Sequence, residues 1–381
     1  MKIYKKYKFL EFFAGGGMAR AGLGDKWECS FANDIDKKKA EVYLANWGND
    51  HFLLADVNSI KSTDLPGKVE LSWASFPCQD LSLAGVRAGL SAKRSGTFWP
   101  FWNLMRQLVK EKRPPAIIVL ENVEGALSSH DGKDFVAIGS AFSGLGYRFG
   151  AVVLDAVHFL PQSRPRLFII GVRMGIKIPT ALRIKGPFSL WHPKAVSQAF
   201  SKLSKNAKKR WVWWNIPLPG PRKHNFIDII EERPTNIEWN SQEKTEYIIS
   251  LMNHRHKNKL MQVIKTGRKT VGGLYRRTRS GKQRAEVRFD DVAGCLRTPS
   301  GGSSRQTLII VEGNVVRSRL LSPREAARLM GLEDFYQLPI NYNDAYHLAG
   351  DGVAVPVVRH LSKHLIEPLL KANIKEKLKA A

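Results

Sequence analysis

Short apolar runs alternate with helix-like segments over residues 1–175, and this alternation restricts the fold more than any other feature of the chain. The apolar runs are KFLEFFA, WECSFAND, ELSWASF, AIIVLENV, YRFGAVVLDA and RLFIIGV. Helical patterns such as KKKAEVYLANW and FWPFWNLMRQLVKEK lie between them. Strands that alternate with helices favour an α/β domain built on a mostly parallel sheet.

The pattern changes after about residue 175. From there to about residue 313 the chain has scattered Pro, Gly, Lys and Arg, five of its ten Trp, and no sustained period. A helical pattern returns in LSPREAARLMGL and in the tail around VPVVRHLSKHLIEPLLKA. A chain of 381 residues is longer than one core usually organises. We therefore expect a discontinuous α/β domain, residues 1–175 and 316–381, interrupted by an insert at 176–315.

The charge of the insert indicates its partner. The whole chain has 60 Lys and Arg against 34 Asp and Glu, a net charge of +26. Residues 176–315 alone hold 27 Lys and Arg against 10 Asp and Glu. A uniformly solvated basic surface would not concentrate charge in this way, so we expect a polyanion. Nucleic acid is favoured over a membrane, because no amphipathic basic helix dominates the insert and no apolar run is long enough to span a bilayer.

The three cysteines, Cys29, Cys78 and Cys295, show neither metal-ligand spacing nor a disulfide framework. No metal site is predicted, and a reducing, cytoplasmic setting fits best. Glu11 interrupts the only apolar stretch near the start, which argues against a cleaved signal peptide.

A glycine-rich turn at residues 13–18 follows the first expected strand and opens a helix. Such a turn lets the backbone approach a ligand closely, although a plain tight turn has the same composition. Arg20 stands at the third glycine position of a dinucleotide fingerprint, which counts against NAD. Asp34 and Asp56 end the next two expected strands, where carboxylates suit ribose hydroxyls and an adenine amino group. Each acid alone is more often a solvated loop residue, but the ordered set favours a nucleoside site.

Cys78 lies in SFPCQDLS, just beyond another expected strand. A lone cysteine is usually inert and buried, but neighbouring amides or cations can lower the pKa of a thiol until it is a nucleophile. Glu121 ends the strand AIIVLENV and is either a surface acid or a catalytic acid. Gln162, Arg164 and Arg166 alternate, so we expect all three on one face of a strand. That face is either a salt-bridged edge or a surface for an anionic ligand.

Nine segments in order make the chain resemble the cytosine-carbon-5 DNA methyltransferase family from residue 9 to about residue 366. They are EFFAGGGMARAGL, ANDID, AD at 55–56, FPCQDLS, SGT at 95–97, ENV, QSRPR, RLLSPREAARLMG and GDGVAVPVV. The resemblance implies a doubly wound, Rossmann-like domain that depends on S-adenosylmethionine. It also implies that the insert is a small target-recognition domain.

The resemblance implies four catalytic residues. The thiolate of Cys78 would add to carbon 6 of a cytosine turned out of the duplex. Glu121 would bind ring nitrogen 3 and the amino group and supply a proton. Arg164 would hold the cytosine carbonyl, and Arg166 would orient Glu121.

The resemblance also implies the binding residues. S-adenosylmethionine would contact the glycine turn, the acidic strand ends and GDGVAVP, that is Phe13, Ala14, Gly15, Gly16, Gly17, Met18, Asp34, Ile35, Asp56, Val57, Pro77, Asp351 and Val353. DNA would contact Gln79, Arg87, Arg94, Thr97, Gln162, Arg297, Thr298, Gly301, Gly302 and Arg305. Met18, Asp34 and Asp351 depart from the family's usual residues.

In the insert, CLRTPSGGSSRQTLII resembles a recognition loop. Arg297 and Arg305 suit bidentate contacts to guanine, worth about 1–3 kcal/mol of discrimination, although most arginines here only neutralise phosphate. TVGGLYRRTRSGKQR is expected to be a second basic loop along the backbone. The cluster of Trp211, Trp213 and Trp214 is interpreted as a small core rather than a base-stacking platform.

The sequence therefore predicts a monomeric, sequence-specific DNA methyltransferase in a bacterial cytoplasm, associated with the nucleoid when it acts. It would bind double-stranded DNA and work beside a separate restriction endonuclease without contacting it. One rival is a cytosine methyltransferase that acts on RNA, which the large basic insert disfavours. Another is an inactive DNA-binding regulator, which would not need Cys78, Glu121, Arg164 and Arg166 together.

Overall fold

Seven strands form the main sheet of a computed structural model that describes residues 6–77, 97–235, 237–279, 281–297 and 305–380. The chain divides into two compact units. The first contains residues 1–154, 165–218 and 357–381, and the second contains 155–164 and 219–356.

The strands of the first unit follow the expected alternation. Its sheet has the order β3-β2-β1-β4-β5-β7-β6. The strands are β1 (Tyr7–Phe12), β2 (Trp27–Asp34), β3 (Phe52–Leu54), β4 (Leu71–Ala74), β5 (Ile117–Val123), β6 (Tyr147–Asp155) and β7 (Pro165–Arg173). Neighbours from β3 to β5 pair in parallel, whereas β5 and β7 are antiparallel. The prediction of a mostly parallel α/β sheet is confirmed.

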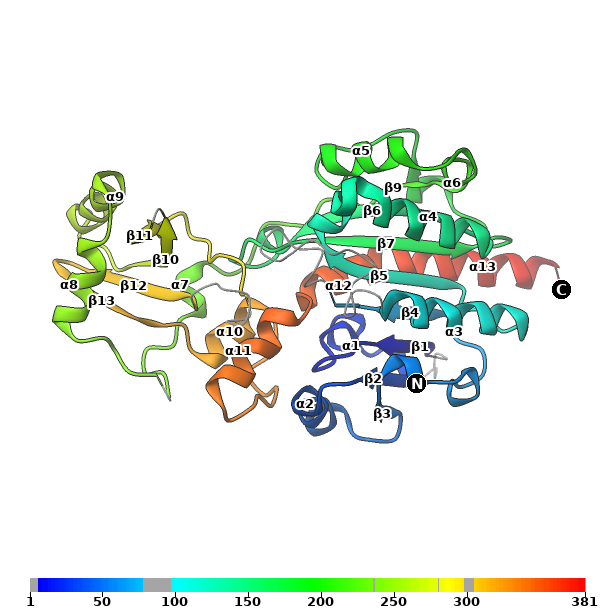
Figure 1. Cartoon of the computed structure of the whole chain (residues 1–381), viewed down its shortest axis with the longest axis horizontal. Helices are drawn as coiled ribbons and strands as arrows, with labels where there is room; N and C mark the ends of the chain where they lie inside the picture. The colour runs from blue at the N-terminus through cyan, green and yellow to red at the C-terminus, as the bar shows by residue number, and fades with distance from the viewer. Residues whose placement is uncertain (1–5, 78–96, 236, 280, 298–304, 381) are drawn as a thin grey trace. The chain divides into compact units, whose positions relative to one another are not determined.

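Helices cover both faces of this sheet (Figure 1). They are α1 (Met18–Leu23), α2 (Lys37–Trp47), α3 (Phe98–Lys110), α4 (Lys133–Gly144), α12 (Val355–Leu361) and α13 (Glu367–Ala380). Leu10 and Phe12 of β1 belong to a core that α3 and α4 complete. On the other face, the indole of Trp27 donates a hydrogen bond to Ser362 at the end of α12. The described residues of the candidate site lie at or just beyond the carboxyl ends of the parallel strands.

Residues 176–218 extend the first unit with α5 (Lys194–Lys202), α6 (Lys205–Arg210), β8 (Arg183–Ile184) and β9 (Trp213–Trp214). Trp211 packs against Phe200 and Trp213, with ring centroids 5.3 and 5.2 Å away. Trp214 is fully buried. The interpretation of this cluster as a small core is confirmed.

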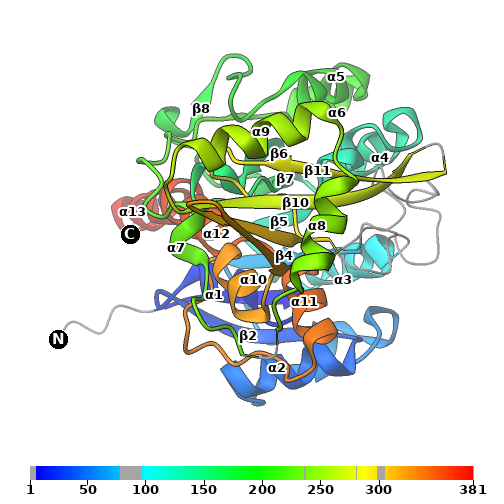
Figure 2. The same ribbon diagram turned by 90° about the vertical axis from the view of Figure 1, so that its left-hand side faces the viewer.

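A four-stranded antiparallel sheet organises the second unit, in the order β11-β10-β12-β13. Its elements are α7 (Phe226–Ile229), α8 (Gln242–Ser250), α9 (His254–Lys265), β10 (Thr270–Arg279), β11 (Lys282–Arg288), β12 (Thr307–Glu312), β13 (Val315–Leu320), α10 (Pro323–Leu329) and α11 (Tyr342–Asp351). Apolar residues of α8 and α9 pack on one face of this sheet (Figure 2). Near α10, Arg319 and Glu325 form a fully buried ion pair of 2.6 Å.

The boundaries of the two units differ from those of the domains that the sequence predicts. Residues 316–356 pack with the second unit, although the sequence pattern assigns them to the α/β domain. Residues 176–218 pack with the first unit and carry nine Lys or Arg and no Asp or Glu. About half of the excess charge of the 176–315 segment thus belongs to the first unit. No helix in the described part of the chain is long and apolar enough to cross a membrane.

Candidate functional site

The glycine turn lies between β1 and α1 and has the backbone that its sequence predicts. Phe13, Gly15 and Gly17 have φ values of 57°, 55° and 78°, in the left-handed region that favours glycine. A β-carbon on Gly15 would meet no atom within 4 Å, so the backbone there is open to a ligand.

Trp47, the last residue of α2, supports this turn. Its indole nitrogen donates a 3.0 Å hydrogen bond to the carbonyl of Gly16. A β-carbon on Gly17 would lie only 2.8 Å from Cδ1 of the same ring, so the turn needs glycine at this position. The guanidinium of Arg20 lies over the indole ring of Trp47, 4.7 Å from its centroid. Sequence reasoning missed Trp47, since only its place at a helix end could have indicated it.

Asp34 connects the end of β2 to the glycine turn. One carboxylate oxygen accepts the amide of Gly15 at 2.8 Å, and the other accepts the amide of Asp36 at 2.9 Å. A carboxylate has about four acceptor positions, so both oxygens can still accept hydroxyl groups. Ile35, the next residue, is 66% exposed, which leaves an apolar surface beside the acid.

Asp56 lies after β3 and is exposed. Its side chain accepts the amide of Asn58 at 2.9 Å and so begins a short helical turn, while Val57 is buried. Gly15, Asp34 and Asp56 therefore follow the ends of β1, β2 and β3, three neighbouring strands of one sheet. This is the arrangement that the sequence predicts for a nucleoside site.

The turn that leads to Cys78 is tied to the end of β5. Asn122 donates a hydrogen bond of 3.3 Å to the carbonyl of Phe76, one residue before Pro77. Its side-chain oxygen accepts the amide of Val123 at 2.8 Å. Asn122 thus fixes the chain ends of β4 and β5 relative to each other. Cys78 itself lies outside the described residues.

Glu121 is buried and forms an ion pair with Arg166 of β7. Nε of Arg166 lies 3.4 Å from Oε1 of Glu121. The antiparallel register sets Arg166 opposite Val123, two residues beyond the glutamate on the same face of β5. The two predicted residues are brought together by the pairing of their strands.

Gln162 and Arg164 have other partners. The side chain of Gln162 is fully buried, accepts the amide of Leu296 at 3.3 Å and donates to the carbonyl of Leu329 at 2.6 Å. Both ends of its amide are therefore bonded inside the protein, and the contact of Gln162 with DNA stays a prediction. Arg164 is 1% exposed, and its Nη1 and Nη2 donate to backbone carbonyls of Leu296, Gly350 and Gly352. These bonds fix the guanidinium of Arg164, and its contact with a cytosine carbonyl stays a prediction.

The remaining predicted residues are distributed over both units. Thr97 precedes α3 and is half-buried, whereas Asp351 ends α11 and is exposed. Val353 is buried. Gln79, Arg87, Arg94, Thr298, Gly301 and Gly302 lie outside the described residues, as Cys78 does.

The two arginines that flank residues 298–304 differ in their surroundings. Arg297 is exposed and has no hydrogen bond to the described part of the chain. Arg305 is half-buried, donates a hydrogen bond to the side chain of Asn343, and lies 5.2 Å from the ring centroid of Tyr342. Arg305 is therefore docked on α11, and Arg297 is not.

The seven-stranded sheet and the glycine turn after its first strand define the Rossmann-like fold of S-adenosylmethionine-dependent methyltransferases. The fold resembles that of the Entamoeba histolytica methyltransferase EhMeth, with a TM-score of 0.63 and 13% identity. That likeness covers 96% of this chain and 99% of the other.

The family model for C-5 cytosine-specific DNA methylases matches residues 7–367. The chain belongs to this family and is a DNA (cytosine-5-)-methyltransferase. It is 26% identical to the type II methyltransferase M.BsuFI of Bacillus subtilis, over 97% of this chain and 75% of that protein. It is 27% identical to M.HpaII of Haemophilus parainfluenzae, over 96% and 90%.

Proposed function

We propose that the chain transfers a methyl group from S-adenosylmethionine to carbon 5 of a cytosine within a specific sequence of double-stranded DNA, with Cys78 as nucleophile. The observation that carries the proposal is the buried pair of Glu121 and Arg166 beside the turn that leads to Cys78. A buried acid held by a guanidinium on the next strand suits a site that must present a carboxyl group to a base in one orientation.

The residues around the glycine turn fit S-adenosylmethionine. The open backbone at Gly15 suits the methionine end, and the carboxylate of Asp34 suits the ribose hydroxyls. The exposed face of Ile35 suits the flat adenine ring, with Asp56 to accept its amino group. When bound, S-adenosylmethionine supplies an electrophilic methyl group, which carbon 5 of the cytosine accepts.

The protein residues provide the remaining chemistry. Addition of the Cys78 thiolate to carbon 6 makes carbon 5 nucleophilic, and protonation of ring nitrogen 3 by Glu121 favours that addition. Arg166 keeps Glu121 in place. Loss of the proton on carbon 5 and elimination of Cys78 then restore the ring. Since the thiolate attacks from above the ring plane, the cytosine must first leave the base stack.

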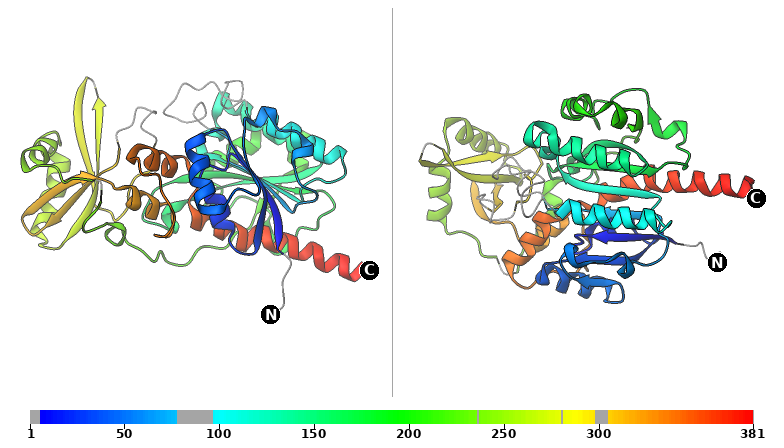
Figure 3. Two further views of the ribbon diagram at one scale, coloured as in Figure 1. Left: turned by 90° about the horizontal axis from the view of Figure 1, so that it is seen from below. Right: turned by 45° about the vertical axis from the view of Figure 1, so that its right-hand side comes forward.

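The second unit supports DNA recognition. β12 pairs with β10 only at Thr270–Leu274, whereas β11 pairs with β10 as far as Arg279. The outer parts of β10 and β11 thus form a two-stranded ribbon that extends past the rest of the sheet (Figure 3). A basic two-stranded ribbon fits the major groove of DNA. Arg297, which is exposed and has no hydrogen bond to the described residues, is the better base-reading candidate, whereas Arg305 is held on α11 by Asn343 and Tyr342.

We infer that such specific methylation protects host DNA beside a separate restriction endonuclease, as the type II methyltransferase names of the relatives suggest. Bisulfite sequencing of DNA from cells with the wild-type gene and with Cys78→Ser tests the proposal. Methylated cytosines at one recurring sequence, found only with the wild type, would support it. Equal patterns in both would remove Cys78 from the mechanism, and methylation of RNA alone would overturn the DNA assignment.

A further inference from the structure

A long stretch of the second unit carries cations without any acid. Residues 247–285 contain eleven Lys or Arg and no Asp or Glu. The stretch covers α9 and most of the β10–β11 hairpin. Arg255 and Lys257 lie near the amino end of α9, where the helix dipole disfavours positive charge. The sequence thus keeps cations where they do not stabilise the helix.

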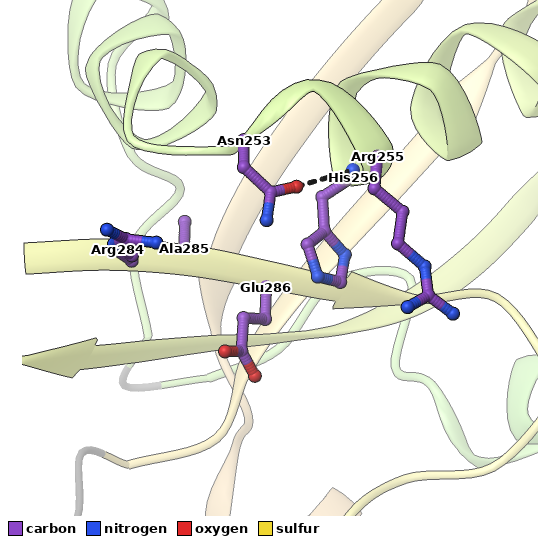
Figure 4. Close-up of a pocket in the computed structure, with 6 residues that line it drawn as sticks. All are labelled: Asn253, Arg255, His256, Arg284, Ala285 and Glu286. Carbon is purple, nitrogen blue, oxygen red and sulfur yellow. Dashed lines mark hydrogen bonds between the residues drawn. The ribbon is translucent and has the colours of Figure 1, made fainter. Parts of the chain in front are cut away.

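A pocket of about 360 Å³ lies between the start of α9 and β11. Its lining residues are Asn253, Arg255, His256, Arg284, Ala285 and Glu286. In the view of Figure 4, Arg284 and Arg255 lie at opposite ends of the group, with His256 and Glu286 between them. Two arginines from different elements therefore line one pocket.

A second pocket of about 370 Å³ lies further along the same two elements. Lys259 and Gln262 line it from α9 and Thr266 from the residue after this helix, while Arg288 and Asp290 line it from the end of β11 and just beyond. Arg255, Lys259, Gln262 and Thr266 are three or four residues apart, so they form one stripe on the helix. We call the two pockets together the α9–β11 groove.

The acids of this groove already have cationic partners. Glu286 lies 3.4 Å from Arg277, and Asp290 accepts hydrogen bonds from Arg288 at 2.7 and 2.5 Å. Arg288 accordingly holds the pKa of Asp290 below its usual value.

Three cations of the groove have no hydrogen bond to an acid among the described residues. Arg255 and Arg284 form no ion pair in the described part of the chain, and Lys259 acts on Asp290 only through its charge. Arg284 also lies directly opposite Arg277 in the strand register, a like-charge pair that weakens a hairpin. An anion bound from outside the chain would offset both the positive charge near the amino end of α9 and the repulsion between Arg277 and Arg284.

The backbone of β11 is not available for an added strand here. The amide of Ala285 donates to Leu251 at 3.1 Å, and the amide of Val287 donates to Nδ1 of His256 at 3.1 Å. A peptide that pairs with this sheet edge is therefore excluded at these residues, and recognition must come from side-chain charge. A ligand with anionic groups repeated along a line would place negative charges beside the cations that follow the length of the groove.

We propose that the α9–β11 groove binds the phosphate backbone of duplex DNA outside the bases that the protein reads. The proposal rests on the proposed function for its choice of DNA as the polyanion. It assigns the groove to affinity for flanking DNA and not to sequence discrimination, because phosphate contacts carry no base information.

The test compares the salt dependence of binding for a triple variant, Arg255→Gln, Lys259→Gln and Arg284→Gln. The matched control changes three cations of the same unit outside the groove, Lys223→Gln, Lys244→Gln and Lys265→Gln. Each phosphate contact contributes about 0.9 to the slope of log K against log salt, so the groove variant should lose about 2–3 on duplexes of about 30 base pairs. The control should lose less, and a short duplex that covers only the recognised sequence should show little difference.

This binding assay needs no methyl transfer, so it separates the two proposals. An inactive wild type that still showed the groove-dependent slope would contradict the proposed function and support the groove. A groove variant with the wild-type slope, or a control that loses as much, would overturn the groove proposal. If the salt slope of the groove variant equalled that of the wild type, an acidic protein would be the partner that fits these charges.

Discussion

Arg166 and Glu121 lie on neighbouring antiparallel strands, with Nε of the arginine 3.4 Å from Oε1 of the glutamate. The exposed fractions of their side chains are only 15% and 7%. A pair this well buried is screened little by salt. The strand register, rather than a flexible loop, therefore sets the direction of the acid on which the proposed proton transfer depends.

Changing Glu121 to Gln should slow methyl transfer sharply while DNA affinity changes little. Glutamine keeps the shape and the hydrogen-bonding ability of the side chain but cannot supply a proton. Single-turnover kinetics with labelled S-adenosylmethionine provide the measurement, and Glu124→Gln, three residues further on, is the control. A rate within about twofold of the wild type would make Glu121 a structural acid.

Changing Trp47 to Phe should weaken cofactor binding without a change in the rate at saturating cofactor. The substitution removes the hydrogen bond to the carbonyl of Gly16 but keeps an aromatic ring beside Gly17. A neutral hydrogen bond contributes about 0.5–1.5 kcal/mol, which corresponds to a roughly two- to tenfold loss of affinity. Calorimetric titration with S-adenosylmethionine measures it, with Trp99→Phe on α3 as control. Unchanged affinity would show that the turn does not depend on Trp47.

Glu11 should make stability fall as the pH rises. Burial raises its pKa from 4.5 to about 8, although Arg20 opposes the shift. The folded state thus keeps a proton that the unfolded chain releases, so this contribution is complete below about pH 4.5 and is lost as the pH rises to about 8.

Glu11→Gln removes the titrating group, so its melting temperature should rise relative to the wild type between pH 5 and pH 8. Glu28→Gln, on the exposed part of β2, should not produce this trend. The prediction would be contradicted if the melting temperatures of Glu11→Gln and the wild type changed equally with pH across that range.

Arg297 and Lys282 should have different effects on DNA recognition. Arg297→Ala should relax specificity at one position of the methylated sequence, because a base contact is lost. Lys282→Ala, at the outer end of the β10–β11 ribbon, should weaken binding evenly across sequences and lower the salt slope by about 1. Bisulfite sequencing and salt-dependent binding together distinguish these outcomes. Equal, sequence-independent losses for both would mean that Arg297 only meets phosphate.

Local signals in the sequence identify the strand ends of the site but not the residues that support them. Glycines with left-handed backbone and acids after apolar runs depend on neighbours in the chain, so Gly15, Asp34 and Glu121 could be predicted. Trp47 could not, because its contact with Gly16 spans 31 residues and carries no local pattern.

Two departures from the sequence-based expectations each have a physical reason. The two-residue period that groups Gln162, Arg164 and Arg166 applies only inside a strand, and β7 begins at Pro165. The two earlier side chains therefore donate hydrogen bonds to backbone carbonyls of the second unit, and Arg166 forms the ion pair with Glu121. Residues 176–218 likewise pack with the first unit through aromatic contacts that composition does not reveal.

The central claim is that Cys78 forms a covalent bond to carbon 6 of the cytosine. A duplex in which 5-fluorocytosine replaces the target base tests it, since carbon 5 then has no proton to lose and Cys78 cannot be eliminated. Mass spectrometry of the mixture with S-adenosylmethionine should show a protein–DNA adduct at Cys78 for the wild type and none for Cys78→Ser. No adduct with the wild type, or an equal amount with Cys78→Ser, would contradict the account.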